Sequence, residues 1–426
     1  MRPAGLPHPT GPSRDNPEFT MIKTAAAGLA LVTLLVGAPA QAATPTPAPV
    51  PTPTPCPAPA AVRTDPPVKV PPINDAALRE SIAGLPAADA TAAIVRVSGT
   101  KGSWRAVRGV ADLTTKRKAT AGARFRAGSV TKMFTAAVVL QLVAERKLSL
   151  DDAVQDRLPG LLPASYPKVR VGQLLDHTSG LPAPTVPGTF EYAYRTRFKK
   201  WTPEEYVALA VRNPIEFTPG TAQHYLNTNT FVAGLLIEQV TGRSYEREVT
   251  TRILRPVGMK NSYLPGASVR IRGPHHEGYQ SVPAGFDDAV PYGDGHVVNM
   301  TETSVTSTWA SGDLISTAAD LEKFVKALFS GKVVPPAQLE PMFTVPDVTM
   351  FGACDKPAVY TSGMTRLVLP GGLVAYGKSG ARYGYSAGVG ATRDLARTLV
   401  YSVNSTDAKA SGQNQRAMGI SVAAFS

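Results

Sequence analysis

The chain is poor in cysteine and in long apolar stretches. Its 426 residues include only two cysteines, Cys56 and Cys354, which excludes a cysteine-rich metal site and leaves open whether the two pair. Beyond one apolar stretch near the start, no segment is long and apolar enough to span a bilayer. We therefore expect no metal, no other cofactor and no stable membrane insertion of the mature chain.

That one apolar stretch has the form of an export signal. It runs from Ala25 to Val36, follows Lys23, and leads to a small-x-small sequence, Ala-Gln-Ala, at 40–42. We expect residues 1–42 to be an over-called start, with Met21 as the initiator, plus a signal peptide. The mature protein is then secreted to the extracellular side, either free or associated with the cell wall.

Proline alternates with threonine and alanine through residues 43–72. This composition favours extended polyproline II and offers too few large apolar groups to form a core. We expect a disordered linker, which serves as a simple tail or as a stalk. Residues 73–426 contain no low-complexity sequence and no internal repeat, and are expected to form one folded domain that is a monomer.

The formal net charge is +12. Such an excess of basic residues suits an anionic polymer of the cell envelope. It would suit nucleic acid as well, but the basic residues are spread through the chain without a zinc-finger or basic-zipper pattern. We therefore expect no nucleic-acid partner.

Segments with strand character stand near both ends of residues 73–426. Near the start, residues 91–97 and 104–110 flank a glycine-containing turn and predict an antiparallel hairpin. Near the end, four more segments predict strands, at 365–369, 373–376, 386–392 and 398–403.

The middle of the region has a helical pattern. Thr131–Lys147 is apolar on almost every side, which is typical of a helix buried inside a large protein, and further helical patterns follow at 203–211 and 231–239. The segments predict an α+β fold, in which one antiparallel sheet built from both chain ends is flanked by helices and carries an inserted, mostly α-helical lobe. A site is expected where sheet and lobe meet.

Ser129 and Lys132 stand three residues apart at the start of the predicted buried helix, so their side chains point the same way. A serine needs a base to become a good nucleophile, and a lysine serves as that base where burial or nearby positive charge lowers its pKa. The spacing alone is weak evidence, because Ser98 and Lys101 repeat it in the predicted hairpin turn. We predict Ser129 as an acyl-accepting nucleophile and Lys132 as its base.

A second motif contains the only Tyr-x-Asn of the chain, formed by Tyr225 and Asn227 just before a helical segment. The tyrosine could relay a proton to the leaving group, and the asparagine could orient Lys132 or a substrate amide. Taken alone, the tripeptide is more often part of a loop.

A third motif, Lys378-Ser379-Gly380, follows a predicted strand. On a strand that lines a site, it offers a cation for a substrate carboxylate, a hydroxyl that can bind it, and a glycine that permits close backbone approach. Taken alone, Lys378 would be read as a solvated surface lysine.

These motifs occur in the order typical of one enzyme family. The sequence resembles the secreted serine D-alanyl-D-alanine carboxypeptidases related to class C β-lactamases, from about Ile73 to the C-terminus. The resemblance is carried by Phe-Arg-Ala-Gly-Ser-Val-Thr-Lys at 125–132, Leu-Leu-Asp-His-Thr-Ser-Gly-Leu at 174–181, Tyr-Leu-Asn at 225–227, Trp309 before Ser-Gly-Asp-Leu-Ile-Ser-Thr, and Lys-Ser-Gly at 378–380.

The resemblance implies the β-lactamase/penicillin-binding transpeptidase-like fold, acylation of Ser129, and an oxyanion hole formed by the backbone N–H groups of Ser129 and Ala381. It also implies that Trp309 lines the cleft and that Arg366 holds a terminal carboxylate. Two alternatives stay open: Trp309 could instead belong to the core, and Arg366 could instead be a surface residue.

Two positions depart from the family pattern. The closest carboxypeptidases have His-Thr-Gly followed by Thr as their third motif, whereas here Ala381 follows Lys-Ser-Gly and supplies no hydroxyl. Leu226 replaces a small polar residue in the second motif and makes that wall more apolar.

Two other enzyme classes are argued against by the sequence. Gly-Tyr-Ser-Ala-Gly at 384–388 matches the nucleophile elbow of α/β-hydrolases, but every histidine precedes Ser386, which is the wrong order for that triad. His275, His276 and Glu277 lack the spacing of a zinc hydrolase and lie among glycine and proline, which predicts a loop.

The sequence thus predicts a secreted, penicillin-binding hydrolase that removes D-alanine from peptidoglycan stem peptides through an acyl-Ser129 intermediate. A class C-like β-lactamase and an esterase of the same fold are alternatives for the activity. The non-catalytic alternative is a module that binds cell-wall peptides without turnover.

Overall fold

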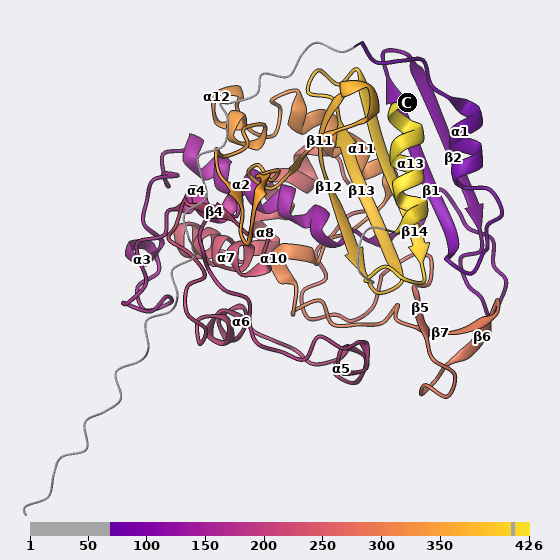
Figure 1. The fold of residues 1–426 in the computed structure, drawn as a ribbon, viewed down its shortest axis with the longest axis horizontal. Helices are drawn as coiled ribbons and strands as arrows, with labels where there is room; N and C mark the ends of the chain where they lie inside the picture. Colours follow the sequence, from indigo (N-terminus) through magenta and orange to yellow (C-terminus); the bar gives the residue numbers. More distant parts are fainter. Residues whose placement is uncertain (1–68, 410–413) are drawn as a thin grey trace, which may run out of the picture. The chain divides into compact units, whose positions relative to one another are not determined.

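The computed structural model describes residues 69–409 and 414–426 (Figure 1). The predicted export signal at 1–42 and the predicted linker up to residue 68 lie outside the described residues, as does Cys56. Cys354, the other cysteine, is disulfide-bonded. No helix in the described ranges is both long and apolar enough to cross a membrane.

A six-stranded sheet joins the two ends of the folded region, as predicted. Its order is β11-β12-β13-β14-β1-β2, and every neighbouring pair is antiparallel. The first strand along the chain, β1, therefore pairs with the last, β14. The strands are β1 (Ala90–Gly99), β2 (Gly102–Gly109), β11 (Thr365–Val368), β12 (Val374–Arg382), β13 (Tyr385–Ala391) and β14 (Arg397–Ser405).

Helices cover the two faces of this sheet because its buried strands are apolar on both sides. On one face, α1 (Asp75–Ser81) and α13 (Gln415–Phe425) pack through residues such as Leu78 and Ile420 against Val95 (Figure 1). On the other face, α11 (Ala318–Phe329) packs through Phe324 into the core that contains Ile94. Neighbouring residues of β1 thus serve opposite faces, as the pleat of a strand requires.

The inserted lobe is helical, and α2 (Thr131–Ala144) lies at its centre. Its residues are buried on almost every side, in agreement with the predicted all-round apolar pattern. The helix ends three residues before the predicted end, where Glu145 and Lys147 form an ion pair at the surface. Around α2 pack α7 (Asn227–Thr241), α8 (Tyr245–Val249) and α10 (Trp309–Gly312).

The remaining elements are short. They are α3 (Val154–Arg157), α4 (Val171–Leu175), α5 (Phe190–Arg195), α6 (Pro203–Ala210), α9 (Arg255–Val257), α12 (Pro336–Leu339), η1 (Gly128–Val130), η2 (Thr250–Leu254), η3 (Glu340–Met342), η4 (Pro370–Gly372), β3 (Phe125–Arg126), β4 (Ala222–Gln223), β5 (Tyr279–Val282), β6 (Val290–Tyr292), β7 (Gly295–Asn299), β8 (Ile315–Ser316), β9 (Thr349–Met350) and β10 (Ala353–Pro357).

Two arguments made from the sequence are confirmed by these elements. Ser98 lies within β1 and Lys101 stands in the hairpin turn, so this second Ser-x-x-Lys has no helix to join its side chains. Ser386 lies inside β13 and its hydroxyl meets that of Ser405 at 2.7 Å, so it forms no nucleophile elbow.

Candidate active site

Ser129 and Lys132 meet where the short η1 turn runs into α2. The side-chain nitrogen of Lys132 lies 3.3 Å from the hydroxyl oxygen of Ser129. The hydroxyl of Thr131 donates to the Gly128 carbonyl oxygen at 2.7 Å and accepts from the Leu314 N–H at 3.1 Å. These bonds fix the turn against the segment that follows α10, so the pair is held by the lobe core.

Two further hydrogen bonds hold the Lys132 amine. It donates to Asn227 Oδ1 at 2.7 Å and to the Ser311 carbonyl oxygen at 3.0 Å. Burial lowers the pKa of Lys132 well below its usual range, and the positive charges of Lys378 and Lys409 lower it further. A neutral amine has two hydrogens and one lone pair, so with both hydrogens used, the lone pair is left for the hydroxyl of Ser129.

Tyr225 stands between the two lysines of the site. Its ring centre lies 4.9 Å from the Lys132 nitrogen and 4.7 Å from that of Lys378. Burial raises the pKa of Tyr225, and nearby Ser129 partly opposes that rise. The Tyr225 hydroxyl forms no hydrogen bond of ordinary geometry with a described residue. The phenol therefore keeps its proton at neutral pH.

Two aromatic residues that the sequence did not assign to the site support Tyr225. The centre of the His177 ring lies 4.6 Å from that of Tyr225, and the centre of the Tyr360 ring lies 4.8 Å from it. Burial lowers the pKa of His177 well below its usual range, and Lys132 and Lys378 add to the effect, so the imidazole is neutral. The Leu-Leu-Asp-His-Thr-Ser-Gly-Leu motif was the signal that could have placed His177 here.

Lys378 reaches the site from strand β12. Its amine donates to the Ser379 carbonyl oxygen at 3.0 Å, and burial lowers its pKa to about 8. Strand β11 pairs with β12 only as far as Gly377. From Lys378 onward, β12 thus has a strand neighbour on one side only, and its other edge faces η1.

The backbones of β12 and η1 touch at two glycines. A Cβ atom on Gly380 would lie 2.0 Å from the Ala127 carbonyl oxygen and 2.7 Å from the Ser129 nitrogen. A Cβ atom on Gly128, whose φ is +53°, would lie 2.7 Å from the Ala381 nitrogen. Only glycine fits either place, and the amides of Ser129 and Ala381 are brought side by side.

Two of the predicted substrate-binding residues, Ser379 and Arg366, lie on opposite faces of the sheet. The side chain of Ser379 alternates to the sheet face that carries α13, where it is exposed and lines a cavity with Met418 and Val422. The side chain of Ser379 therefore points away from the cleft, and only its backbone lies on the strand edge that faces η1. Arg366 pairs with Tyr376 across β11 and β12, which places it on the same face as Lys378.

Trp309 is not brought to Ser129. Its indole is 7% exposed and packs in the lobe core beside Phe231 and Tyr245. A Cβ atom on Gly234 of α7 would lie 2.7 Å from the ring, so this glycine makes room for it. The expectation that Trp309 lines the substrate cleft is replaced by the core alternative.

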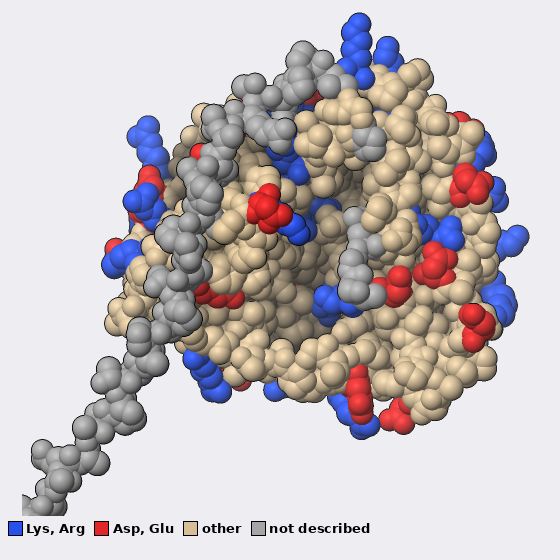
Figure 2. Space-filling model, viewed as in Figure 1, with Lys and Arg blue, Asp and Glu red and all other residues tan. Residues whose placement is uncertain are grey.

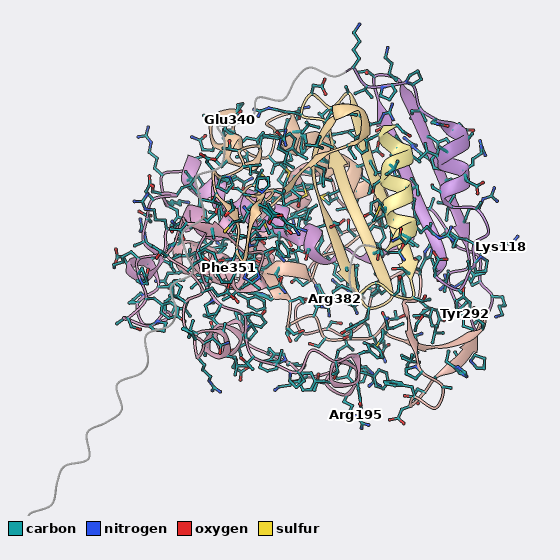
Figure 3. The ribbon with its side chains drawn as sticks, viewed as in Figure 1. Lys118, Arg195, Tyr292, Glu340, Phe351 and Arg382 are labelled. Carbon is teal, nitrogen blue, oxygen red and sulfur yellow. The ribbon has the colours of Figure 1, made fainter. Side chains whose placement is uncertain are left out.

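A basic cavity of about 230 Å³ adjoins the end of β12. Four basic residues line it, Arg197, Lys199, Arg382 and Lys409, and no acidic residue does. Figure 2 shows a hollow with basic side chains inside it, and Figure 3 labels Arg382. Sequence reasoning missed this cluster because Arg382 and Lys409 lie far along the chain from Arg197 and Lys199.

The fold and this arrangement define a serine hydrolase of the β-lactamase and penicillin-binding protein class. Residues 78–422 match the family model described as Beta-lactamase, and the chain belongs to that family. A D-stereospecific amidohydrolase from Streptomyces sp. has the same fold, with a TM-score of 0.70 and 29% identity over 83% of this chain and 98% of that one.

Curated relatives carry names from several activities. Esterase EstB of Burkholderia gladioli is 30% identical over 206 residues, which cover 45% of this chain and 52% of that protein. Penicillin-binding protein 4 of Amycolatopsis lactamdurans is 28% identical over 219 residues, which cover 50% of this chain and 52% of that protein. The chain thus spans about half the length of these relatives.

Proposed function

We propose that this chain is a carboxypeptidase that removes the last residue from peptides ending in D-alanyl-D-alanine, by way of an acyl-Ser129 intermediate. The observation that carries the proposal is the Lys132 amine, which is buried, held by two acceptors and 3.3 Å from the hydroxyl of Ser129.

In the acylation step, the lone pair of Lys132 takes the proton of the Ser129 hydroxyl as its oxygen attacks the peptide carbonyl. The N–H groups of Ser129 and Ala381 donate to the oxyanion that forms. Tyr225 keeps its proton at neutral pH, so it can give that proton to the leaving amine. The C–N bond then breaks. In a second step, water attacks the acyl carbonyl and gives a proton to the Tyr225 phenolate, while Lys132 returns its proton to the Ser129 oxygen as the acid product leaves.

Lys378 supports a substrate with a terminal carboxylate. With a pKa of about 8 it is mostly protonated at pH 7, and it lies over the same Tyr225 ring as Lys132. A carboxylate bound at Lys378 would place the leaving residue beside Tyr225. This charge favours a peptide or a penicillin over a neutral ester.

The test compares three substrates with the full chain: an acyl-D-Ala-D-Ala peptide, its C-terminal amide, and p-nitrophenyl acetate. We expect kcat/KM for the free acid to exceed that for the amide by about tenfold, in the range of a charge-assisted hydrogen bond. Lys378→Gln should abolish this preference, and Lys118→Gln, a change at an exposed lysine, should keep it.

Other outcomes would replace the proposal. Turnover of the ester alone would make the protein an esterase, a reading that Ala381 and Leu226 favour, since neither supplies a hydroxyl. Peptide binding without any turnover would make it a binding module. Rapid loss of penicillin without peptide cleavage would make it a β-lactamase.

A further inference from the structure

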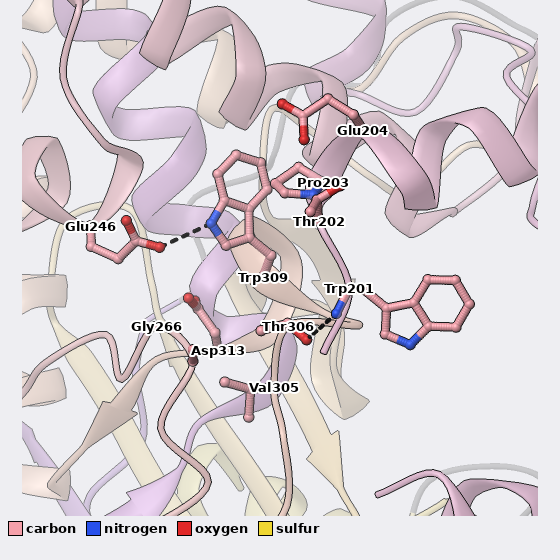
Figure 4. Close-up of a pocket in the computed structure, with 11 residues that line it drawn as sticks. Trp201, Thr202, Pro203, Glu204, Glu246, Gly266, Val305, Thr306, Trp309 and Asp313 are labelled. Carbon is pink, nitrogen blue, oxygen red and sulfur yellow. Dashed lines mark hydrogen bonds between the residues drawn. The ribbon is translucent and has the colours of Figure 1, made fainter. Parts of the chain in front are cut away.

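A second cavity is lined in part by α10 but by none of Ser129, Lys132 and Lys378. It has a volume of about 320 Å³ and is bounded by the start of α6, the start of α8 and α10 (Figure 4). Ser311 of α10 turns its carbonyl oxygen to Lys132, whereas Trp309 and Asp313 line the cavity. The cavity is therefore separate from the proposed catalytic cleft.

Asp313 is the unusual residue of this cavity. It is only 2% exposed, and neither oxygen of its carboxylate has a hydrogen-bond partner among the described residues. A buried carboxyl group without partners costs free energy, which a bound ligand can recover. In Figure 4 its side chain points to the same part of the cavity as Glu246.

The surroundings of Asp313 are acidic. Glu246 lines the cavity and accepts a hydrogen bond from the Trp309 indole N–H at 3.0 Å, and Glu204 stands at the rim. Burial raises the pKa of Asp313, and Glu246 raises it further. Burial also raises the pKa of nearby Glu238; the Tyr245 N–H opposes this rise, and Glu246 and Glu204 add to it.

No described basic residue forms a salt bridge with any of these four acids. Arg382 is near enough to oppose the pKa rise of Asp313, but its effect comes after those of burial and Glu246. In a chain with a formal net charge of +12, four neighbouring acids without basic partners are against the general trend. The cavity is therefore suited to an occupant that brings its own positive charge.

The lining selects the kind of cation. The described residues contain no group of three or more His, Cys, Asp or Glu side chains able to hold a metal ion. Pro203, Ala267, Val305 and the Trp309 indole supply apolar walls beside the carboxylates. Carboxylates next to an indole and aliphatic side chains suit an ammonium group on a short alkyl chain.

We propose that this cavity binds an alkylammonium cation, with the ammonium group between Asp313 and Glu246 and the alkyl chain against Trp309. The site does not depend on acylation of Ser129, so its test is independent of the proposed function.

The experiment titrates the full chain with n-butylammonium chloride at constant ionic strength and follows binding by calorimetry and by tryptophan fluorescence. We expect saturable binding that weakens at least tenfold in both Asp313→Asn and Glu246→Gln. The matched control Glu302→Gln removes an exposed acid elsewhere and should bind as the wild type does. n-Butanol, which has the alkyl chain without the charge, should not bind.

Proton release gives a second readout. Because Asp313 holds its proton in the empty cavity, a bound cation should expel it, and the heat of binding should depend on the buffer for the wild type but not for Asp313→Asn. The proposal is wrong if the wild type shows no saturable binding. It is equally wrong if Glu246→Gln and Asp313→Asn bind as tightly as Glu302→Gln does.

Discussion

The two sides of α10 hold residues of opposite type, and burial acts in the same way on both. On the Ser129 side, Lys132 is buried near Lys378 and Lys409, and its pKa is lowered. On the other side, Asp313 is buried near Glu246, and its pKa is raised. In both places, burial and neighbours of like charge favour the neutral form, of the Lys132 amine on one side and of the Asp313 carboxyl group on the other. One side therefore holds a base ready to accept a proton, and the other holds an acid ready to release one.

Removal of the base should give the largest effect. Lys132→Met is expected to slow acylation by about 10³- to 10⁴-fold, because the Lys132 nitrogen is the base within hydrogen-bond distance of the Ser129 hydroxyl. Stopped-flow measurement of acylation checks this, with Lys101→Met, from the other Ser-x-x-Lys, as the control. A loss below about tenfold would mean that another group is the base.

Removal of the Tyr225 hydroxyl should have the next largest effect. Tyr225→Phe keeps the ring between the two lysines and loses the proton donor, so we expect kcat for a peptide to fall by about 10²-fold. An ester with a good leaving group needs no such proton and should lose less than about tenfold. Equal losses on both substrates would show that the hydroxyl acts in some other way.

The pH profile should separate the two lysines. Activity requires Lys132 neutral, so it should rise with pH through the lowered pKa of that residue. A substrate carboxylate requires Lys378 charged, so peptide hydrolysis should fall again above about pH 8, by up to about tenfold in total. The ester profile should keep the rise and lack this fall. A peptide profile that stays flat above pH 8 would remove Lys378 from carboxylate binding.

The smallest effect concerns stability on the acidic side of α10. A carboxyl whose folded pKa is raised contributes stability below its unfolded value, near 3.8, and loses it as the pH rises through the folded pKa. Asp313→Asn should therefore be more stable than the wild type near pH 7, by about 1–3 kcal/mol, with the two converging below pH 4. Urea unfolding at several pH values measures this, and a less stable variant at pH 7 would contradict it.

Much of the fold was predictable because it depends on local patterns. The hairpin of β1 and β2, the C-terminal strands and the buried α2 each follow from a run of residues with a clear period. A single sheet built from both chain ends followed from strands at both ends with helices between, but the pairing of β1 with β14 itself was not predicted. For α7 the predicted start at 231 was late, since the helix begins at Asn227 with polar residues that carry no apolar signal.

The site was predictable where residues share a motif and not where they meet only through the tertiary fold. Ser129 and Lys132 are brought together by one helical turn, and Gly380 is required by a close backbone contact. Trp309 was misplaced because its position depends on the space beside Gly234, which lies 75 residues earlier in the printed sequence. Lys409 gave no local signal, and Asp313 lies in the Ser-Gly-Asp-Leu-Ile-Ser-Thr stretch but was assigned no role.

The most direct test of the central claim is the location of the acyl group. The full chain is mixed briefly with benzylpenicillin or with p-nitrophenyl acetate, quenched with acid, weighed intact and mapped by peptide mass. We predict one acyl group on the peptide that contains Ser129, present in wild type and in the Ser98→Ala control and absent in Ser129→Ala. An adduct that persists in Ser129→Ala, or no adduct from either reagent, would contradict the account.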